Sequence, residues 1–264
     1  MDAPLRIWLD ICYIKALPAR LMDWDWSAIL SREVNLVAAS ELSYALFGAT
    51  ILAVALLFYV TDLLCLLRTR LRAGYCLLTV AGSLTIFASL LSTYFFMSDN
   101  FALRTVYEHS SASLPPLLKL SASWTGSGGS LLLWLTMMTT ALLAFRFSKR
   151  RSMYNERGSS IMMSFFTMVV LAFTLLADPF RQLGVSVPDG LGQSPSLRTF
   201  WSMLHPPLVF AAYTTILLSY AIILGRRWTP KAGPSSADDR MLWASWVLLS
   251  LAISLGGVWA YETL

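Results

Sequence analysis

Long apolar stretches alternate with polar connections along most of this chain. Each apolar stretch is about 18 to 25 residues long, and a helix needs about 20 mostly apolar residues to cross the hydrocarbon core of a bilayer. The pattern predicts an all-α integral membrane protein with six transmembrane helices. The six stretches cover approximately residues 42–66, 74–97, 129–147, 160–177, 204–224 and 241–260.

The composition supports a membrane protein. Of the 264 residues, 56% are hydrophobic and only 13% are charged, whereas an ordinary globular domain carries about 25% charged residues. Such a chain has too few charges to cover a water-soluble core with polar surface.

Most basic residues lie in three short connections, and positively charged loops are typical of the cytoplasmic side of a membrane. The two long connections, 98–128 and 178–203, hold few of them. We therefore expect both long loops and both termini outside (N-out, C-out). The net charge of +5 then reflects topology, and nucleic acid is not an expected partner. The short connections hold Arg68, Arg70 and Arg72; Arg146, Lys149, Arg150, Arg151 and Arg157; and Arg226, Arg227, Lys231 and Arg240.

Residues 1–40 differ in composition from the rest of the chain. Trp8, Trp24 and Trp26 are mixed there with acidic and basic residues, a mixture too polar to span a bilayer. We interpret 1–40 as an extracytoplasmic amphipathic segment on the outer membrane surface, with its tryptophans at headgroup level. Residues 41–264 are then the six-helix transmembrane domain.

A glycine- and serine-rich run precedes the third predicted span, Trp124-Thr-Gly-Ser-Gly-Gly-Ser130, followed by Leu-Leu-Leu-Trp134. Read as a loop, it offers close backbone approach at its glycines and exposed amides that can bind an anion such as a carboxylate. Its two tryptophans offer flat surface to an aromatic ligand. The alternative is a tight turn whose tryptophans belong to the interfacial aromatic belt.

His205-Pro206-Pro207 opens the fifth predicted span. A neutral imidazole at the end of a span is a potential iron ligand. The two prolines, expected in the first helical turn where proline costs little, would fix how the ring is presented. A hydrogen-bonded helix-cap histidine is the alternative. The other histidine, His109, is expected to be a solvated loop residue.

Other chemistry has little support in the sequence. Asp62 lies near the end of the first span, close to Arg68, and its carboxylate is expected to reach the membrane surface. The chain has no Walker loop, no H-E-x-x-H motif and no paired carboxylates at helical spacing in a span, so nucleotide use and conventional hydrolysis are not predicted. It also has no C-x-x-C-H motif for covalent haem.

At these residues the chain resembles the CcmF family, the haem lyase subunit of the cytochrome c maturation (system I) pathway. The family has W-G-x-H-E-G-S-L-L-L-W in an outer loop that runs into a helix, and Trp124 to Trp134 has the same frame. Downstream, the run that begins at Asp189 and the H-P-P-L run that begins at His205 are similar to the family's D-G-x-G-x-N-P-x-L and H-P-P-L. The resemblance runs from about residue 40 to the end.

The chain departs from the family pattern in two places. Ser127-Gly128 stand where the family has H-E, so any role of that pair is absent or moved. The chain stops just after Trp259-Ala-Tyr261, whereas a similar segment in the family leads into the tryptophan-rich (WWD) haem-binding domain. We therefore expect an N-terminal portion of a split lyase, with the WWD domain and the b-type haem in a partner chain.

The resemblance implies a haem lyase subunit that is inactive alone. The family receives haem from the chaperone CcmE and presents it to apocytochrome c, whose C-x-x-C-H thiols add across the vinyl groups. His205 matches the histidine that would ligate the iron of this transiently bound haem. Arg198 and Arg181 are candidates for contact with the propionates. The remaining matched positions would wall or present the haem: Trp124, Gly129, Ser130, Trp134, Pro206 and Pro207.

The implied partners are a CcmF-like C-terminal chain with the WWD domain, CcmE, apocytochrome c with its thiol-handling factors, and the lipid membrane. The implied location is a bacterial or archaeal plasma membrane or an organellar inner membrane, with the functional face extracytoplasmic. Two alternatives stay open. One is a non-catalytic haem-delivery or scaffold subunit, and the other is a transporter or respiratory membrane anchor, although transporters usually place polar residues or broken helices at the bilayer midplane.

Overall fold

Apolar helices dominate the computed structural model, which describes residues 26–148, 157–227 and 236–263. Contacts divide the chain into two units, Met1–Ser40 and Glu41–Leu264. Most of the predicted amphipathic segment, residues 1–25, lies outside the described residues, and residues 26–40 form the first part of a helix. The elements in order are α2 (Trp26–Leu67), α3 (Leu71–Met97), α4 (Arg104–His109), α5 (Pro116–Ala122), α6 (Gly126–Phe147), α7 (Arg157–Ala177), η2 (Pro195–Leu197), α8 (Phe200–Arg227) and α9 (Ser236–Thr263).

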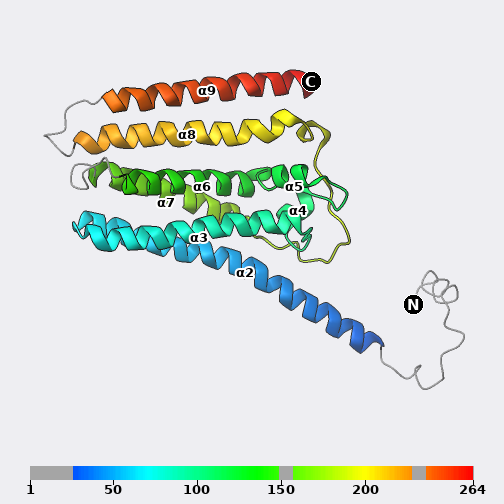
Figure 1. The fold of residues 1–264 in the computed structure, drawn as a ribbon. Helices are drawn as coiled ribbons and strands as arrows, with labels where there is room; N and C mark the ends of the chain where they lie inside the picture. Colours follow the sequence, from blue (N-terminus) through cyan, green and yellow to red (C-terminus); the bar gives the residue numbers. More distant parts are fainter. Residues whose placement is uncertain (1–25, 149–156, 228–235, 264) are drawn as a thin grey trace, which may run out of the picture. The chain divides into compact units, whose positions relative to one another are not determined.

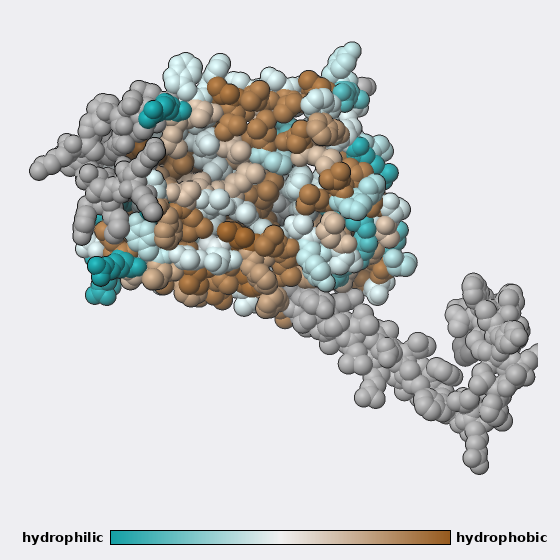
Figure 2. Space-filling model, in the orientation of Figure 1, coloured by the Kyte–Doolittle hydropathy of each residue, from teal (hydrophilic) through white to brown (hydrophobic). Residues whose placement is uncertain are grey.

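Six of the described helices are long and apolar enough to cross a membrane, which confirms the predicted spans and a multi-pass membrane protein. On the visible face the most hydrophilic residues gather toward the helix ends, while apolar residues line the middle (Figure 2). The orientation of the helices in a membrane stays a prediction. The spanning segments are Leu46–Leu67, Leu71–Met97, Gly126–Phe147, Arg157–Ala177, Phe200–Gly225 and Arg240–Thr263.

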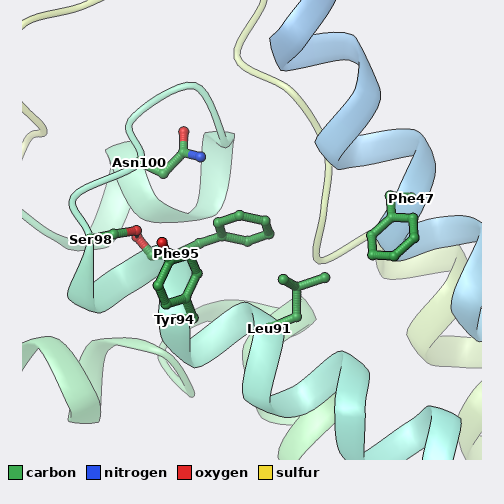
Figure 3. A pocket seen from close by; sticks show the side chains of 6 residues that line it. All are labelled: Phe47, Leu91, Tyr94, Phe95, Ser98 and Asn100. Carbon is green, nitrogen blue, oxygen red and sulfur yellow. The ribbon is translucent and has the colours of Figure 1, made fainter.

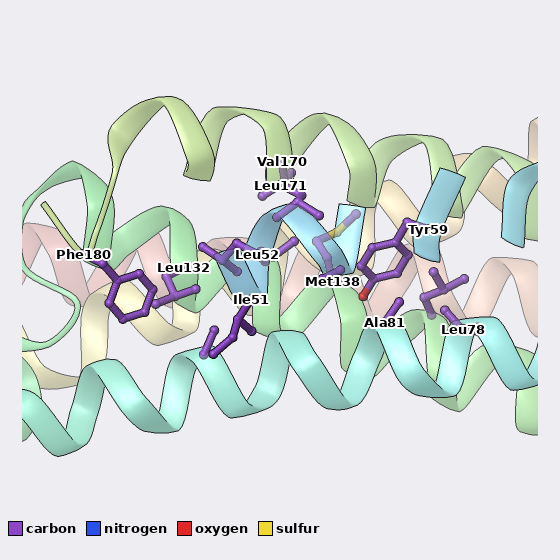
Figure 4. Packing of buried hydrophobic residues seen from close by; sticks show 14 of the residues in the cluster. Ile51, Leu52, Tyr59, Leu78, Ala81, Leu132, Met138, Val170, Leu171 and Phe180 are labelled. Atoms are coloured by element: carbon purple, nitrogen blue, oxygen red, sulfur yellow. The ribbon is translucent and has the colours of Figure 1, made fainter. Parts of the chain in front are cut away.

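Within the second unit, α3, α6, α8 and α9 lie side by side in that order, and α7 packs against both α6 and α8 (Figure 1). The core lies where α2, α3, α6 and α7 meet (Figure 4). Tyr59 of α2 is fully buried there, and its hydroxyl lies 2.8 Å from the Thr139 hydroxyl of α6. At one end of this core Phe180, from the loop after α7, covers Gly48, where a methyl group would lie 2.3 Å from the ring.

The expectation that Asp62 reaches the surface is wrong. Its side chain is fully buried, and both carboxylate oxygens accept hydrogen bonds from Arg146 Nη1, at 2.8 and 2.6 Å. Ser164 of α7 donates a third at 3.4 Å. Arg146, expected in a short loop, belongs to the last turn of α6. An unpaired charge inside a bilayer is costly, so the two charges pair and tie α2 to α6.

The two long loops bind each other at the end of the unit where α9 finishes (Figure 1). Backbone amides of 104, 183, 191 and 192 donate across the two loops at 2.8 to 3.0 Å. The Asp189 carboxylate accepts the Ala112 and Gly190 amides at 2.8 and 2.7 Å. Gly190 lies against the Ser110 carbonyl: a methyl group on Gly190 would be 2.1 Å from the Ser110 carbonyl oxygen. The D-G-x-G run therefore holds these loops together, and we call them the loop cap (residues 98–125 and 178–199).

Candidate functional site

His205 lies six residues into α8, which begins one turn earlier than predicted. Thr199 immediately precedes the helix, and its hydroxyl accepts the Ser202 amide at 3.3 Å, as an N-cap does. The expectation that Pro206 and Pro207 occupy the first turn is therefore wrong, because they lie inside the helix. Prolines there lack the N–H groups that would bond the carbonyls of the residues four positions earlier. The helix beside His205 is thus less completely hydrogen-bonded than an ordinary span.

The His205 ring packs against one face of α9. Its Nδ1 lies 3.0 Å from the Ala252 carbonyl oxygen. Gly256 lies directly against the ring, because a methyl group there would be 2.6 Å from Cε1. The Trp259 ring adds a tilted contact with 5.8 Å between centroids. Positions four and three residues apart share a helix face, so one face of α9 holds the half-buried imidazole.

The contact with Ala252 determines the tautomer of His205. A carbonyl oxygen only accepts hydrogen bonds, so Nδ1 carries a proton, and in the neutral ring the lone pair is then on Nε2. No hydrogen bond to Nε2 is formed by any residue of the described parts of the chain. In histidines that ligate a metal, one ring nitrogen binds the metal, and the other usually donates a hydrogen bond, often to a backbone carbonyl.

The donor set restricts which metal such a ring can hold. Among the described residues, no group of three or more histidine, cysteine, aspartate or glutamate side chains comes together. A single imidazole does not complete the coordination sphere of a free ion. It does suit an iron that brings its own ring of nitrogen ligands, as in haem, where the protein supplies axial ligands. Among the described residues, His205 is therefore suited to be an axial ligand of haem iron.

Trp259 also connects this site to the loop cap. Its indole N–H donates to the Ser196 carbonyl at 2.8 Å. Two residues further on, the Arg198 Nε donates to the Gln193 carbonyl at 2.8 Å, and the exposed guanidinium lies beside Gly192. The structure thus brings the loop that carries Arg198 to the same end of α9 as His205.

Gly126–Ser130 of the glycine- and serine-rich run form the first turn of α6, so the description of the run as a loop is wrong, while the place of its tryptophans in an interfacial belt stays a prediction. Gly126 begins the helix with a φ of 77°, a conformation that glycine adopts without strain. A methyl group on Gly129 would lie 2.2 Å from the Ser123 carbonyl. The Ser130 hydroxyl donates to the Trp124 carbonyl at 2.8 Å. These small residues let the chain turn sharply from α5 into α6.

The two predicted wall tryptophans lie on different interfaces of α6. Trp134 contacts α8, stacked on Phe210 with 6.0 Å between centroids and edge-on to Tyr213 at 5.9 Å. Trp124 lines a hollow of about 110 Å³ between α6 and residues of α3, with Gly129. Trp134 therefore lies along α8 beyond His205, whereas Trp124, Gly129 and Ser130 gather at the start of α6.

His109 belongs to a short helix and not to a loop, contrary to expectation. It ends α4, is half-buried, and its Nδ1 donates to the Thr105 carbonyl at 3.0 Å. Its ring covers Gly126, where a methyl group would lie 2.9 Å from Cε1. It lines a hollow of about 270 Å³ together with Arg104 and Arg181. Arg181 thus belongs to this hollow, on which the start of α6 also borders.

A third hollow lies on the side of α2 and α3 (Figure 3). It has a volume of about 380 Å³, with Phe47, Leu91, Tyr94 and Phe95 as walls and Ser98 and Asn100 at its rim. It contains no predicted site residue and no histidine, cysteine or carboxylate in its lining.

Sequence reasoning missed the α9 residues that hold His205. Ala252 and Gly256 are small residues four positions apart in an apolar helix, a pattern that lets two membrane helices approach closely. Trp259 follows on the same face. The pattern was visible in the sequence, but which helix would pack there was not.

The comparisons with known proteins point to one family. The family described as Cytochrome C assembly protein matches residues 124–264. The cytochrome c-type biogenesis protein NrfE of Haemophilus influenzae is 31% identical over 193 residues, covering 70% of this chain and 29% of that protein. The cytochrome c-type biogenesis protein CcmF of Escherichia coli is 27% identical over 201 residues, covering 74% of this chain and 30% of that protein.

The chain thus spans less than a third of the length of these two relatives. No solved structure matches. The family match covers both tryptophans, the run from Asp189, His205 and all of α9. The chain is an N-terminal CcmF-like portion and belongs to the cytochrome c assembly protein family.

Proposed function

We propose that this chain is a haem-handling subunit of cytochrome c maturation that holds the iron of substrate haem on His205 Nε2. The observation that carries the proposal is the bond from Nδ1–H to the Ala252 carbonyl, because it leaves Nε2 as a free donor on a fixed ring. Membership of the family supports it, and the relatives are named as cytochrome c-type biogenesis proteins.

Attachment of haem depends more on how the porphyrin is oriented toward the cysteine thiols than on reactive side chains of this chain. In thioether formation a cysteine sulfur of apocytochrome c bonds one vinyl carbon, and a proton ends on the other, with no net transfer of electrons. Fixing the porphyrin through its iron leaves the vinyl edge accessible and limits its rotation, and holding two reactants in place lowers the barrier. His205 would supply this constraint.

The surroundings of His205 suit a flat apolar ligand. Trp259 lies against the imidazole, and Trp134 with Phe210 and Tyr213 forms an aromatic group further along α8. Arg198, held on the adjacent loop, is proposed to contact a propionate. Trp124, Gly129 and Ser130 contribute indirectly, because they set where α6 begins.

The complete lyase is proposed to need a partner chain that carries the WWD domain and the b-type haem. The proposed suppliers and acceptors are CcmE and apocytochrome c with its thiol-handling factors, on the extracytoplasmic face. The long-loop end of the unit is the proposed working face, since His205 and both long loops meet there.

Coexpression with a candidate C-terminal partner and a reporter c-type cytochrome tests the proposal. The native chain is compared with His205→Ala and with a matched control, His109→Ala, and each chain is quantified by immunoblot in the membrane. We expect haem-stained cytochrome with the native chain and the control, and background levels with His205→Ala at equal chain abundance.

The opposite result would separate the alternatives. Equal cytochrome from the native chain and His205→Ala would remove His205 from the mechanism and favour the scaffold or delivery subunit. Gly128, where the family has glutamate, packs tightly against Pro179: a methyl group there would lie 3.0 Å from Pro179 Cα, so a larger side chain does not fit without a shift.

A further inference from the structure

We propose that α9 is the positioning element for His205, with Gly256 and Trp259 as positioning residues that set how the imidazole meets iron. This inference rests on the proposed function and names the part of the chain that regulates the same site. It concerns α9 because that helix supplies three contacts that orient the ring: Ala252 at Nδ1, Gly256 against Cε1 and Trp259 against the ring.

Gly256 controls the distance between the two helices. A methyl group there would lie 2.6 Å from Cε1 and 3.0 Å from Nδ1 of His205, and carbon atoms are not found so close without a shift. The ring is half-buried between two helices, so it cannot relax without changing its angle or losing the Ala252 bond. Gly256 therefore permits the ring orientation that the Ala252 carbonyl selects.

The chemistry of the acceptor matters for a transient ligand. A carboxylate behind a metal-bound histidine raises the basicity of the ring and strengthens the metal bond. Here the acceptor is a neutral backbone carbonyl. The ring is thus held in the ligating tautomer and is made a stronger donor by less than a carboxylate would make it, which suits haem that must arrive and leave.

Trp259 makes the orientation depend on the loop cap. Its ring touches the imidazole, while its N–H bonds the Ser196 carbonyl, two residues before Arg198. One side chain therefore links the proposed iron ligand to the loop that carries the proposed propionate contact. A displacement of α9 relative to α8 would therefore disturb the ring contact and the Ser196 bond at the same time.

The adjacent glycine provides a matched control. Gly257 is also in α9, but nothing lies within 4 Å of a methyl group placed there. Gly256→Ala and Gly257→Ala therefore make the same change to the helix backbone, and only the first touches His205. Any difference between them reports the contact with the ring.

The experiment uses the full chain coexpressed and purified with its C-terminal partner, and hemin as the probe. The readouts are bound haem per complex, its absorption and electron paramagnetic resonance spectra, and covalent reporter cytochrome. We expect Gly256→Ala to weaken hemin binding by about 10-fold or more, the usual effect of disturbing a residue behind a metal ligand. Its spectrum should shift, while Gly257→Ala behaves as native.

The outcomes distinguish the two proposals. If His205→Ala binds haem with the native spectrum, the proposed function fails. If His205→Ala loses the spectrum while Gly256→Ala matches Gly257→Ala, the proposed function stands and the positioning role of α9 is overturned. If Gly256→Ala accumulates poorly, the double variant His205→Ala/Gly256→Ala decides: recovery to the level of His205→Ala places the defect at the ring, and no recovery overturns the proposal.

Discussion

The regions around His109 and His205 share one local geometry and differ in everything around it. In each, Nδ1 donates to a backbone carbonyl at 3.0 Å and the ring covers a glycine. For His109 the acceptor is Thr105, one turn back in the same short helix. For His205 it is Ala252, on another helix 47 residues away in sequence.

The surroundings explain why only one of the two fits haem. His109 borders a hollow lined by Arg104, Glu108, Asp178 and Arg181, a set of charges that favours water and ions. His205 is held by an alanine carbonyl, a glycine and a tryptophan, with further aromatic rings along α8. A porphyrin buries a large apolar face, so the tautomer alone does not make a haem site and the apolar environment is also needed.

The largest expected effect separates the two histidines directly. Hemin titration of the detergent-purified complex should show affinity reduced by ~10-fold or more for His205→Ala, because one coordinate bond is lost and ~1.4 kcal/mol corresponds to each tenfold. His109→Ala should bind as native. Added imidazole should restore part of the affinity of His205→Ala. Equal losses for both variants would contradict the comparison.

Replacing the glycine that lies against each histidine ring by alanine should affect stability at Gly126 and hemin affinity at Gly256. Gly126 has a φ of 77°, so Gly126→Ala forces a side chain into a strained conformation that costs about 1 to 3 kcal/mol. Gly256 is in the interior of a helix, where alanine causes no backbone strain. Unfolding in denaturant should therefore show lower stability for Gly126→Ala, with hemin affinity unchanged. A haem defect in Gly126→Ala would show that the two regions are coupled.

Replacing Asp189 should loosen the long loop that contains His109 more than it changes the hemin site at His205. Asp189→Ala removes the acceptor of the Ala112 amide, which joins the two long loops, and of the adjacent Gly190 amide. Hydrogen bonds to charged groups contribute about 1.5 to 3 kcal/mol when shielded, and less is expected here because Asp189 is exposed. Limited proteolysis should be faster within 98–125. The hemin spectrum should largely persist, because the bond that joins the loop cap to the His205 site runs from Trp259 to Ser196 and does not involve Asp189. Loss of the spectrum would show that the Asp189 bonds also help to position the ring.

The smallest effect is expected at the exposed ion pair beside His109. Arg104 Nε lies 2.6 Å from Glu108 Oε1, and both side chains are more than a third exposed. Exposed pairs four residues apart on a helix contribute about 0.3 to 0.5 kcal/mol. Glu108→Gln should change unfolding stability by no more than this and should leave cytochrome formation intact. A large loss would mean that the charged hollow has a role in haem handling.

Much of the fold was predictable because hydrophobicity acts locally. The six spans were located within a few residues, since each depends on its own apolar length. The start of α8 was missed by one turn because His-Pro-Pro looked like a helix opening, whereas Thr199 provides the cap. The glycine- and serine-rich run looked like a loop because its residues are poor helix formers, but close packing against Ser123 makes it a helical turn.

The buried pair could not be located from the sequence. Asp62 has Arg68 as its nearest basic neighbour in the chain, yet its partner is Arg146, 84 residues away. Charges inside a membrane protein pair with whatever the packing of helices brings near. The same applies to Trp124 and Trp134, which share a motif but face different helices.

The sequence by itself determined the membrane class, the number of spans, the family and the identity of His205 as the candidate ligand, because apolar length and motif residues are properties of contiguous chain. Only the tertiary structure decided which nitrogen of His205 is free, which glycine lies against the ring and which arginine shares its end of α9. Those features depend on the packing of α8 against α9 and on a hydrogen bond between residues far apart in the chain. Contacts of that kind exist only once the helices have assembled.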